Sequence, residues 1–273
     1  MGPMIRRYSR SVANVITAQR HRQKCLEARE LLPRLFPRIS NTLRAQRAAG
    51  GLYHLYSEFK LLELASYLER IWPASVVEFG SGSTTAVFAE YAAKNPGSKV
   101  VSVDEDAAYS ARTRASLDPR VRGYVTFVVS PRVVATRNGW EVCHYSPGFH
   151  ESLKKGGIEM CYVDGPFNQS PADARRLLPC VDSVILLESG FEIQDFLFDY
   201  RISSVNYFCG SAFGPLFEQY LHPLVYADDA WIDGPIRHHS WLHRKRHTLC
   251  DPLESSPGGA KSDSDRLLSM DDS

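Results

Sequence analysis

The stretch SVVEFGSGST, residues 75 to 84, decides the fold of this 273-residue chain. Its first five residues are rich in β-branched and aromatic side chains, which is typical of a short buried strand, and glycines follow directly. A helical pattern begins at Thr84, so Gly80 and Gly82 lie in a tight strand-to-helix turn whose backbone N–H groups can approach a ligand. Taken alone this is weak evidence, because a plain turn with Ser83 or Thr84 as the helix N-cap also explains it.

An acidic residue follows the next predicted strand at an informative interval. The run KVVSV, residues 99 to 103, ends in Asp104, which lies 22 residues after Gly82. In doubly wound α/β folds, an acid about 20 residues after the glycines receives the ribose hydroxyls of a bound nucleoside. The alternative is that Asp104 caps the helix predicted after it. The pairing of Asp104 with the glycine turn favours the ribose interpretation.

Strand and helix patterns alternate along the middle of the chain. Strands are predicted at 75–79, 99–103, 121–129, 158–163 and 181–187, with an extra edge strand at 140–145. Helices are predicted at 52–71, 84–94, 107–117, 171–179 and 190–199. Two further runs, 204–209 and 216–225, are joined too closely for a parallel crossover and predict an antiparallel hairpin. The whole pattern predicts an α/β fold with a doubly wound, mostly parallel Rossmann-like sheet that ends in this hairpin.

The charge is uneven along the chain, although the net charge is only +1. Residues 1–50 carry 11 Arg and Lys against two acids and predict a basic helical extension, which we interpret as a lid. A mitochondrial presequence and an arm for RNA or a membrane surface are alternatives. Residues 51–233 are acidic and form the predicted ligand-binding domain. Residues 234–273, basic and then acidic, predict a disordered tail, and His238, His239, His243 and His247 are assigned to it.

Composition excludes some classes of protein. No run of 18 apolar residues occurs, so no transmembrane segment is predicted. The six cysteines have no CxxC pair or compact spacing, unlike a disulfide framework or a zinc site, which predicts a cytoplasmic protein. The oligomeric state stays open.

Glu78 discriminates between two kinds of ligand. A dinucleotide-binding fingerprint has an apolar residue two positions before the first glycine and a third glycine later, whereas this chain has Glu78 and Thr85 there. NAD is therefore disfavoured. With these residues the chain resembles the class I S-adenosylmethionine-dependent methyltransferases. The resemblance runs from about Leu61 to Val225 through the motifs VVEFGSGSTT, VVSVDED and MCYVDGPF, and is nearest to a small-molecule subgroup with EFGSGxST and VDGP.

The resemblance implies S-adenosylmethionine as the cofactor and a small molecule as the methyl acceptor. It implies that Glu78 orients the glycine loop or the cofactor amine and that Asp104 binds the ribose. The adenine pocket would lie near Ser130. The full set of implied cofactor-binding residues is Glu78, Gly80, Ser81, Gly82, Ser83, Asp104, Glu105 and Ser130.

Asp164 is the candidate catalytic residue. It ends the fourth predicted strand, where open α/β sheets bind ligands, and Gly165-Pro166 follows. It can position a nucleophile, act as its base or hold the charged end of the cofactor, although Asp-Gly also favours a plain turn. Metal-dependent catechol-type methyltransferases carry an Asp here and an Asp-Asn pair after the next strand. In this chain the corresponding stretch is Leu187-Glu188-Ser189, in which only Glu188 offers a carboxylate. The set of metal ligands is therefore incomplete, and no metal site is predicted.

These observations predict transfer of a methyl group from S-adenosylmethionine to an oxygen or nitrogen of a small-molecule acceptor. One alternative is a nucleotide-binding, non-methylating enzyme on the same sheet. Another is a non-catalytic domain that holds RNA or an acidic partner through its basic arm. The acidic middle disfavours nucleic acid as a partner except through residues 1–50.

Overall fold

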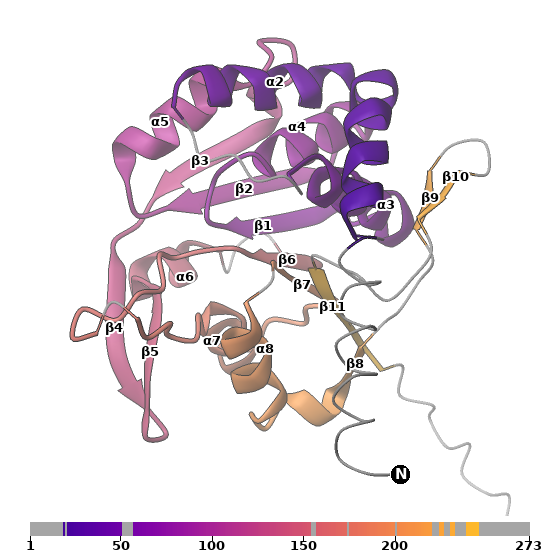
Figure 1. The fold of residues 1–273 in the computed structure, drawn as a ribbon. Helices are drawn as coiled ribbons and strands as arrows, with labels where there is room; N and C mark the ends of the chain where they lie inside the picture. The colour runs from indigo at the N-terminus through magenta and orange to yellow at the C-terminus, as the bar shows by residue number, and fades with distance from the viewer. Residues whose placement is uncertain are drawn as a thin grey trace, which may run out of the picture.

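The structure is a computed structural model that describes residues 19, 21–50, 57–153, 157–173, 175–199, 201–219, 224–226, 230–232 and 239–245. A twisted central sheet crosses the molecule, with α2, α3, α4 and α5 on one face and α6, α7 and α8 on the other (Figure 1). These helices have the bounds α2 Pro37–Ala48, α3 Ser57–Ile71, α4 Thr85–Lys94, α5 Ala107–Ser116, α6 Pro147–Leu153, α7 Asp182–Glu188 and α8 Ile202–Cys209.

The main sheet has seven strands in the order β3-β2-β1-β6-β7-β11-β8. In this order, β3, β2, β1, β6 and β7 are parallel to one another, whereas β11 is antiparallel to both of its neighbours. Their bounds are β1 Ser75–Phe79, β2 Lys99–Asp104, β3 Val125–Val129, β6 Met160–Val163, β7 Asp195–Asp199, β8 Phe217–Gln219 and β11 His239–Arg244. The predicted α/β class with a mostly parallel sheet is therefore confirmed.

Two hydrophobic cores cover the two faces of the sheet, because successive strand side chains point to opposite sides. Val76 and Leu197 pack with α3 and α4 in one core. Val77, Phe196 and Phe198 pack with α7 and α8 in the other. Each central strand is consequently apolar on both faces, as a parallel sheet covered by helices requires.

Two small two-stranded sheets accompany the main one. In the first, β4 (Arg132–Arg137) and β5 (Trp140–Tyr145) form an antiparallel hairpin. Asn138 and Gly139 join them with φ values of +51° and +78°, as a two-residue hairpin turn prefers. The edge strand predicted at 140–145 is thus a strand, but in a separate hairpin. The second sheet pairs β9 (Leu224–Tyr226) with β10 (Ala230–Ile232).

The predictions between 171 and 209 are wrong in several places. The predicted strand at 181–187 is α7, the predicted helix at 190–199 contains β7, and the predicted strand at 204–209 is α8. No helix occurs among the described residues of 171–179. A short apolar run is compatible with a strand and with a buried helix, so the local pattern does not distinguish them. Gly190, with φ +85°, follows the end of α7, as glycines commonly do at helix ends.

The C-terminal part also differs from the prediction. His239–Arg244, assigned to a disordered tail, is β11 in the middle of an antiparallel group, and the predicted hairpin of 204–209 with 216–225 does not form. Trp241 and Leu242 each enter one of the two cores, and this burial explains why the strand is ordered. The tail from Ser255, together with His238 and His247, lies outside the described residues.

The described part of the basic extension is helical over 21–35 and in α2. Ile39 and Leu43 of α2 are buried, and the helix contacts α4 and α5. None of the described helices combines the length and apolar character needed to cross a membrane.

Candidate functional site

The sheet has a topological switch point between β1 and β6. The chain runs outward from β1 through β2 to β3 and then returns to the other side of β1 as β6. Ligands of open α/β sheets bind at the carboxyl ends of the strands at such a point. The turn after β1, Asp104 at the end of β2, Ser130 after β3 and Asp164 after β6 all lie at this edge. The structure therefore brings the residues singled out in the sequence to one edge of the sheet, where open α/β folds have their ligand crevice.

The loops after β1 and β6 touch through two glycines. Gly80 has φ +94°, and a Cβ atom there would lie 2.7 Å from the Gly165 backbone nitrogen and 2.8 Å from the Asp164 carbonyl carbon. A Cβ atom at Gly165 would lie 2.6 Å from Gly80 and 2.5 Å from Tyr145 Oη. Asp164 N–H also donates to the Phe79 carbonyl at 2.8 Å. Gly80 is thus required by contact between the loops, whereas Gly82 has only Tyr109 Oη within 4 Å of its Cβ position.

Glu78 is buried beneath the glycine loop. Its carboxylate accepts hydrogen bonds from the hydroxyls of Thr84 at 2.6 Å, Thr85 at 2.7 Å and Ser102 at 2.6 Å. Burial raises the pKa of Glu78 to about 7, against the opposing effect of these donors. Glu78 therefore ties the start of α4 to β1 and β2.

The N-terminus of α4 has no side-chain cap, because the Thr84 hydroxyl binds Glu78 instead. Ser83 is half-buried at the beginning of this helix. The N–H groups that a helix leaves without intrahelical partners at its N-terminus, together with the helix dipole, favour an anionic ligand group.

Asp104 anchors the glycine loop from the neighbouring strand. Its Oδ2 accepts hydrogen bonds from Ser81 N–H at 3.1 Å and from Ser81 Oγ at 2.9 Å, and its Oδ1 accepts one from Asp106 N–H at 2.9 Å. Burial raises the pKa of Asp104 despite these donors. The N-cap of α5 is Asp106, which accepts from Ala108 and Tyr109 N–H. The alternative role of Asp104 as the helix cap is therefore wrong.

Glu105 and Ser130 lie at the flank of the crevice. Glu105 accepts a hydrogen bond from Phe167 N–H at 2.8 Å and from Tyr145 Oη at 3.2 Å, so it links β2 to the loop after β6. Ser130 is buried, and its hydroxyl lies 3.0 Å from that of Ser146.

Asp164 belongs to a cluster of four charged side chains. Lys60 Nζ of α3 lies 3.1 Å from Asp164 Oδ2 and 2.5 Å from Asp199 Oδ2 at the end of β7. Arg201 donates to the Asp164 backbone carbonyl and lies 3.4 Å from its Oδ1. The Asp164 side chain is 30% exposed, against 12% for Lys60, so its carboxylate is the group that a ligand can reach.

The charges in the cluster set different pKa values for the two acids. Burial and the neighbouring Asp199 carboxylate raise the pKa of Asp164 to about 6, although Lys60 and Arg201 oppose this. Burial also disfavours ionised Asp199, but the Lys60 ammonium and the charge of His239 outweigh burial and lower its pKa. Asp199 is thus the stable carboxylate and Asp164 the more basic one.

A second buried network supports the cluster from below. His239 of β11 lies opposite Asp199 of β7, and its Nδ1 is 2.9 Å from Glu63 Oε2. Its Nε2 lies 3.2 Å from Tyr162 Oη. Lys60 and Glu63 stand three positions apart on α3, so one helix face contacts both strands of the β7–β11 pair through these side chains.

Sequence reasoning missed Lys60, Asp199, Arg201 and Tyr109. Lys60 lies within the helix predicted at 52–71, but no local signal shows that its side chain is nearly buried. Its spacing with Glu63 on the apolar face of the helix is a signal that the pair is partnered. Asp199 directly follows the apolar run Phe196-Leu197-Phe198, just as Asp164 directly follows the β6 run. The sequence pattern predicts the strand at 181–187 instead, so Asp199 is not recognised as a residue at the end of a strand.

The residues do not fit a divalent metal ion. Glu188, the replacement ligand considered from the sequence, lies at the end of α7 and pairs with Arg137. Asp164 and Asp199 do form an acidic pair, but the Lys60 ammonium occupies the position between them. No group of three or more His, Cys, Asp or Glu suited to a metal occurs among the described residues.

The crevice does fit a charged nucleoside ligand such as S-adenosylmethionine. Asp104 retains lone pairs beyond the three bonds it accepts, and the uncapped α4 terminus suits a carboxylate. Burial and the charges of Asp104, Asp164 and Glu78 raise the pKa of Tyr109, whose Oη lies beside Gly82. Tyr109 therefore stands at the mouth of the crevice.

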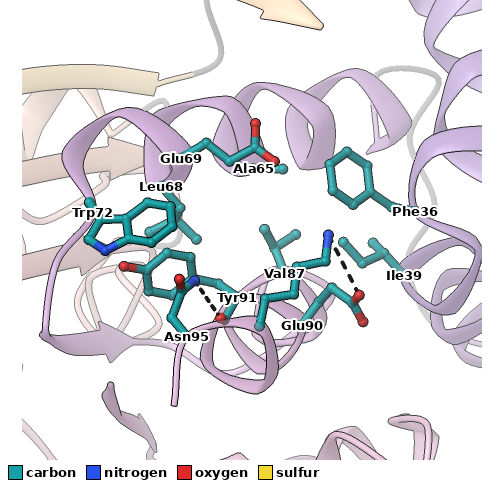
Figure 2. Close-up of a pocket in the computed structure, with 11 residues that line it drawn as sticks. Phe36, Ile39, Ala65, Leu68, Glu69, Trp72, Val87, Glu90, Tyr91 and Asn95 are labelled. Carbon is teal, nitrogen blue, oxygen red and sulfur yellow. Dashed lines mark hydrogen bonds and ion pairs between the residues drawn. The ribbon is translucent and has the colours of Figure 1, made fainter. Parts of the chain in front are cut away.

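A separate apolar pocket of about 140 Å³ lies between α2, α3 and α4 (Figure 2). Phe36, Leu68, Trp72 and Tyr91 line it, with Glu90 at its border. Apart from Val87, the lining residues from α3 and α4 belong to the second halves of those helices, which precede β1 and β2, so the pocket lies toward the opposite edge of the sheet. It contributes no residue to the crevice.

The open sheet and its switch point define an α/β fold of the Rossmann-like class. No protein-family model and no curated protein matches the sequence. Among solved structures, the chain is similar to a protein from Klebsiella pneumoniae assigned as an O-methyltransferase, at 12% identity, covering 82% of this chain and 98% of that one, with a TM-score of 0.52. It is also similar to cofactor-bound Rv0187 from MTB, at 16% identity, covering 78% and 94%, with a TM-score of 0.52. These similarities show the shared fold.

Proposed function

We propose that this protein is an S-adenosylmethionine-dependent methyltransferase that modifies an oxygen or nitrogen of a small-molecule acceptor. The observation that carries the proposal is the meeting of Asp104, the uncapped N-terminus of α4 and Asp164 at one switch point. The shared fold supports it, because one similar structure is assigned as an O-methyltransferase and another is cofactor-bound.

In this proposal each part of the cofactor has a partner in the chain. The Asp104 carboxylate binds the ribose hydroxyls, with Glu105 beside it, and Ser130 borders the adenine. Gly80, Ser81, Gly82 and Ser83 line the methionine part, whose carboxylate lies at the α4 terminus. Glu78 keeps this loop in place through its three hydroxyl donors.

The chemistry asked of the chain is modest. S-adenosylmethionine supplies an already activated methyl group, so positioning the acceptor and excluding water account for much of the rate. Asp164 takes the proton of the acceptor, since its carboxylate reaches the crevice and its pKa is raised to about 6. Lys60 and Arg201 hold that carboxylate in place.

The basic extension acts as a lid in this proposal. Gln46 Nε2 of α2 lies 3.1 Å from Ser116 Oγ and 3.5 Å from the Gly82 carbonyl, so α2 reaches the glycine loop.

The five cysteines in the described part of the chain are free thiols, which supports a reducing, cytoplasmic location.

The test compares the wild-type chain with Asp164→Asn. Both should bind S-adenosylhomocysteine with similar affinity in calorimetry, while methyl transfer to an extracted metabolite pool should fall about 100-fold in the variant, the usual scale for a general base. In the wild type, transfer should rise with pH through about 6, because Asp164 must lose its proton to act.

Failure to bind S-adenosylhomocysteine, together with binding of another nucleotide, would favour the non-methylating enzyme. Salt-sensitive RNA binding that is lost on deleting residues 1–50, without methyl transfer, would favour the non-catalytic domain. Equal loss of unfolding free energy and activity in Asp164→Asn would reduce Asp164 to a turn residue.

A further inference from the structure

Two cysteines from distant parts of the chain face each other next to the crevice. The Sγ atoms of Cys143 on β5 and Cys180 before α7 are 3.6 Å apart. The two residues form a parallel backbone bridge, in which Cys143 N–H donates to the Pro179 carbonyl and Val181 N–H to the Cys143 carbonyl. Neighbouring strands lie about 4.8 Å apart, within the range of Cα separations that a disulfide spans. The sulfurs need to approach by only about 1.5 Å.

The two thiols are chemically unequal. Arg201 Nη1 lies 3.2 Å from Cys180 Sγ. Burial disfavours a thiolate at Cys180, but the hydrogen bond with Cys143 and the Arg201 charge outweigh burial and lower its pKa. The hydrogen bond with Cys180 and burial raise the pKa of Cys143. Cys180 is therefore the more acidic thiol of the pair and the one that more readily becomes a nucleophilic thiolate.

The pair lies behind one surface loop. Cys180 Sγ is 3.5 Å from the Pro166 carbonyl, and the next residue, Phe167, is 55% exposed. Cys143 and Cys180 are themselves buried, so access for a small oxidant requires local opening of this loop.

We propose that Cys143 and Cys180 are a reversible oxidation site, at which hydrogen peroxide converts the two thiols into an intramolecular disulfide. The Cys180 thiolate attacks one peroxide oxygen, which gives Cys180 sulfenic acid and a hydroxide that is protonated to water. The Cys143 sulfur then attacks Cys180 Sγ, and its proton leaves with the sulfenic hydroxyl as a second water. Two thiols lose two electrons in total, and the peroxide gains them. A dithiol reductant reverses the reaction.

Oxidation at this site acts on the crevice through Arg201. That guanidinium contacts Cys180 Sγ, the Pro166 carbonyl and Asp164. When Cys180 enters a disulfide, its sulfur can no longer ionise beside Arg201, so the Arg201 charge is directed to Asp164, which weakens Asp164 as a base. The disulfide itself does not depend on the proposed methyl transfer, whereas this consequence for activity rests on it.

The experiment treats the full chain with hydrogen peroxide, alkylates it in denaturant and maps the peptides without reduction. The expected result is a linked pair of peptides carrying Cys143 and Cys180, which dithiothreitol separates. The link closes a long loop, so the melting temperature of the oxidised chain should rise by roughly 5 to 10 °C.

Two variants complete the design. Cys143→Ser removes the second thiol, so the sulfenic acid at Cys180 should persist and be trapped by dimedone. Cys209→Ser, the matched control, removes the exposed thiol and should leave the link intact. Oxidation of Cys209 while Cys143 and Cys180 stay reduced would overturn the proposal, and so would sulfinic acid at Cys180 without a link. If the link forms but methyl transfer is unchanged, only the coupling through Arg201 is wrong.

Discussion

The Asp104 carboxylate has two roles: it holds the glycine loop in place, and in the proposed function it binds the ribose of the ligand. It already accepts hydrogen bonds from Ser81 and Asp106, and the ribose hydroxyls would use its remaining lone pairs. In Asp104→Asn the charge is lost, and charge-assisted hydrogen bonds contribute about 1.5 to 3 kcal/mol each. We expect S-adenosylmethionine and adenosine to bind 10- to 100-fold more weakly in calorimetry, and free methionine to be unaffected.

The control for this change is Asp106→Asn. Asparagine is as good an N-cap as aspartate, so the α5 cap should persist and adenosine affinity should stay unchanged. In Asp104→Asn, the new amide nitrogen cannot accept a hydrogen bond from Ser81 or Asp106 N–H, so the melting temperature of that variant should fall by a few degrees. Unchanged adenosine binding in Asp104→Asn would show that Asp104 serves only the loop.

Lys60 is the residue that separates this crevice from a metal site. It neutralises Asp164 and Asp199 at the place that a cation with oxygen ligands would take. In Lys60→Met the two carboxylates face each other without the ammonium, so we expect millimolar Mg²⁺ to raise the melting temperature of the variant and not that of the wild type. Lys60→Arg keeps the charge and should not respond. An equal response of the wild type would mean that Lys60 does not block the ion.

At the scale of elements, two glycines of one turn have different roles. Gly80 combines a left-handed φ of +94° with backbone atoms of the β6 loop less than 3 Å from its Cβ position, whereas the Cβ position of Gly82 meets only Tyr109 Oη, in an ordinary contact at 3.5 Å. We expect Gly80→Ala to lower the free energy of unfolding in urea by about 2 to 4 kcal/mol. Gly82→Ala should lower it by less than about 0.5 kcal/mol.

The same pair separates folding from binding. Gly82→Val should keep the fold and lose S-adenosylhomocysteine binding, because its side chain enters the space beside Tyr109. Retained affinity in Gly82→Val would remove the glycine turn from the binding site. Equal stabilities of Gly80→Ala and Gly82→Ala would show that the loops after β1 and β6 move apart freely.

At the scale of the whole molecule, β11 completes both the sheet and the support of the charged cluster. It pairs with β7 and β8, and it carries His239 to Glu63. A chain that ends after residue 233 would leave Glu63 buried without this partner and two strands with open edges. We expect that chain to be insoluble or to lack a cooperative melting transition. A chain that ends after Lys245 retains β11 and should melt cooperatively.

The sequence by itself determined the strands around the glycine turn and the residues that close them. Each of these signals is local: an apolar run, then Gly80 and Gly82, Asp104 or Asp164, within a few positions. A parallel sheet aligns the carboxyl ends of its strands at one edge. Residues at those ends are therefore predicted to lie together even when the order of the strands is not known. The α/β class and the meeting of the glycine turn, Asp104 and Asp164 at one edge of the sheet follow from these signals, whereas Lys60, Asp199 and Arg201 do not.

Only the tertiary structure decided which later segment lies beside β6. The runs 181–187 and 195–199 are both short and apolar, and local pattern does not separate a buried helix from a strand. Next to β6, the run 195–199 places Leu197 in one core and Phe196 and Phe198 in the other, so both faces of the strand are buried. That packing brings Asp199 to Lys60. Strand β11 pairs with β7 because its two sides pack into the same two hydrophobic cores. Such contacts join residues far apart in the chain, and their free energy exists only once the sheet is assembled.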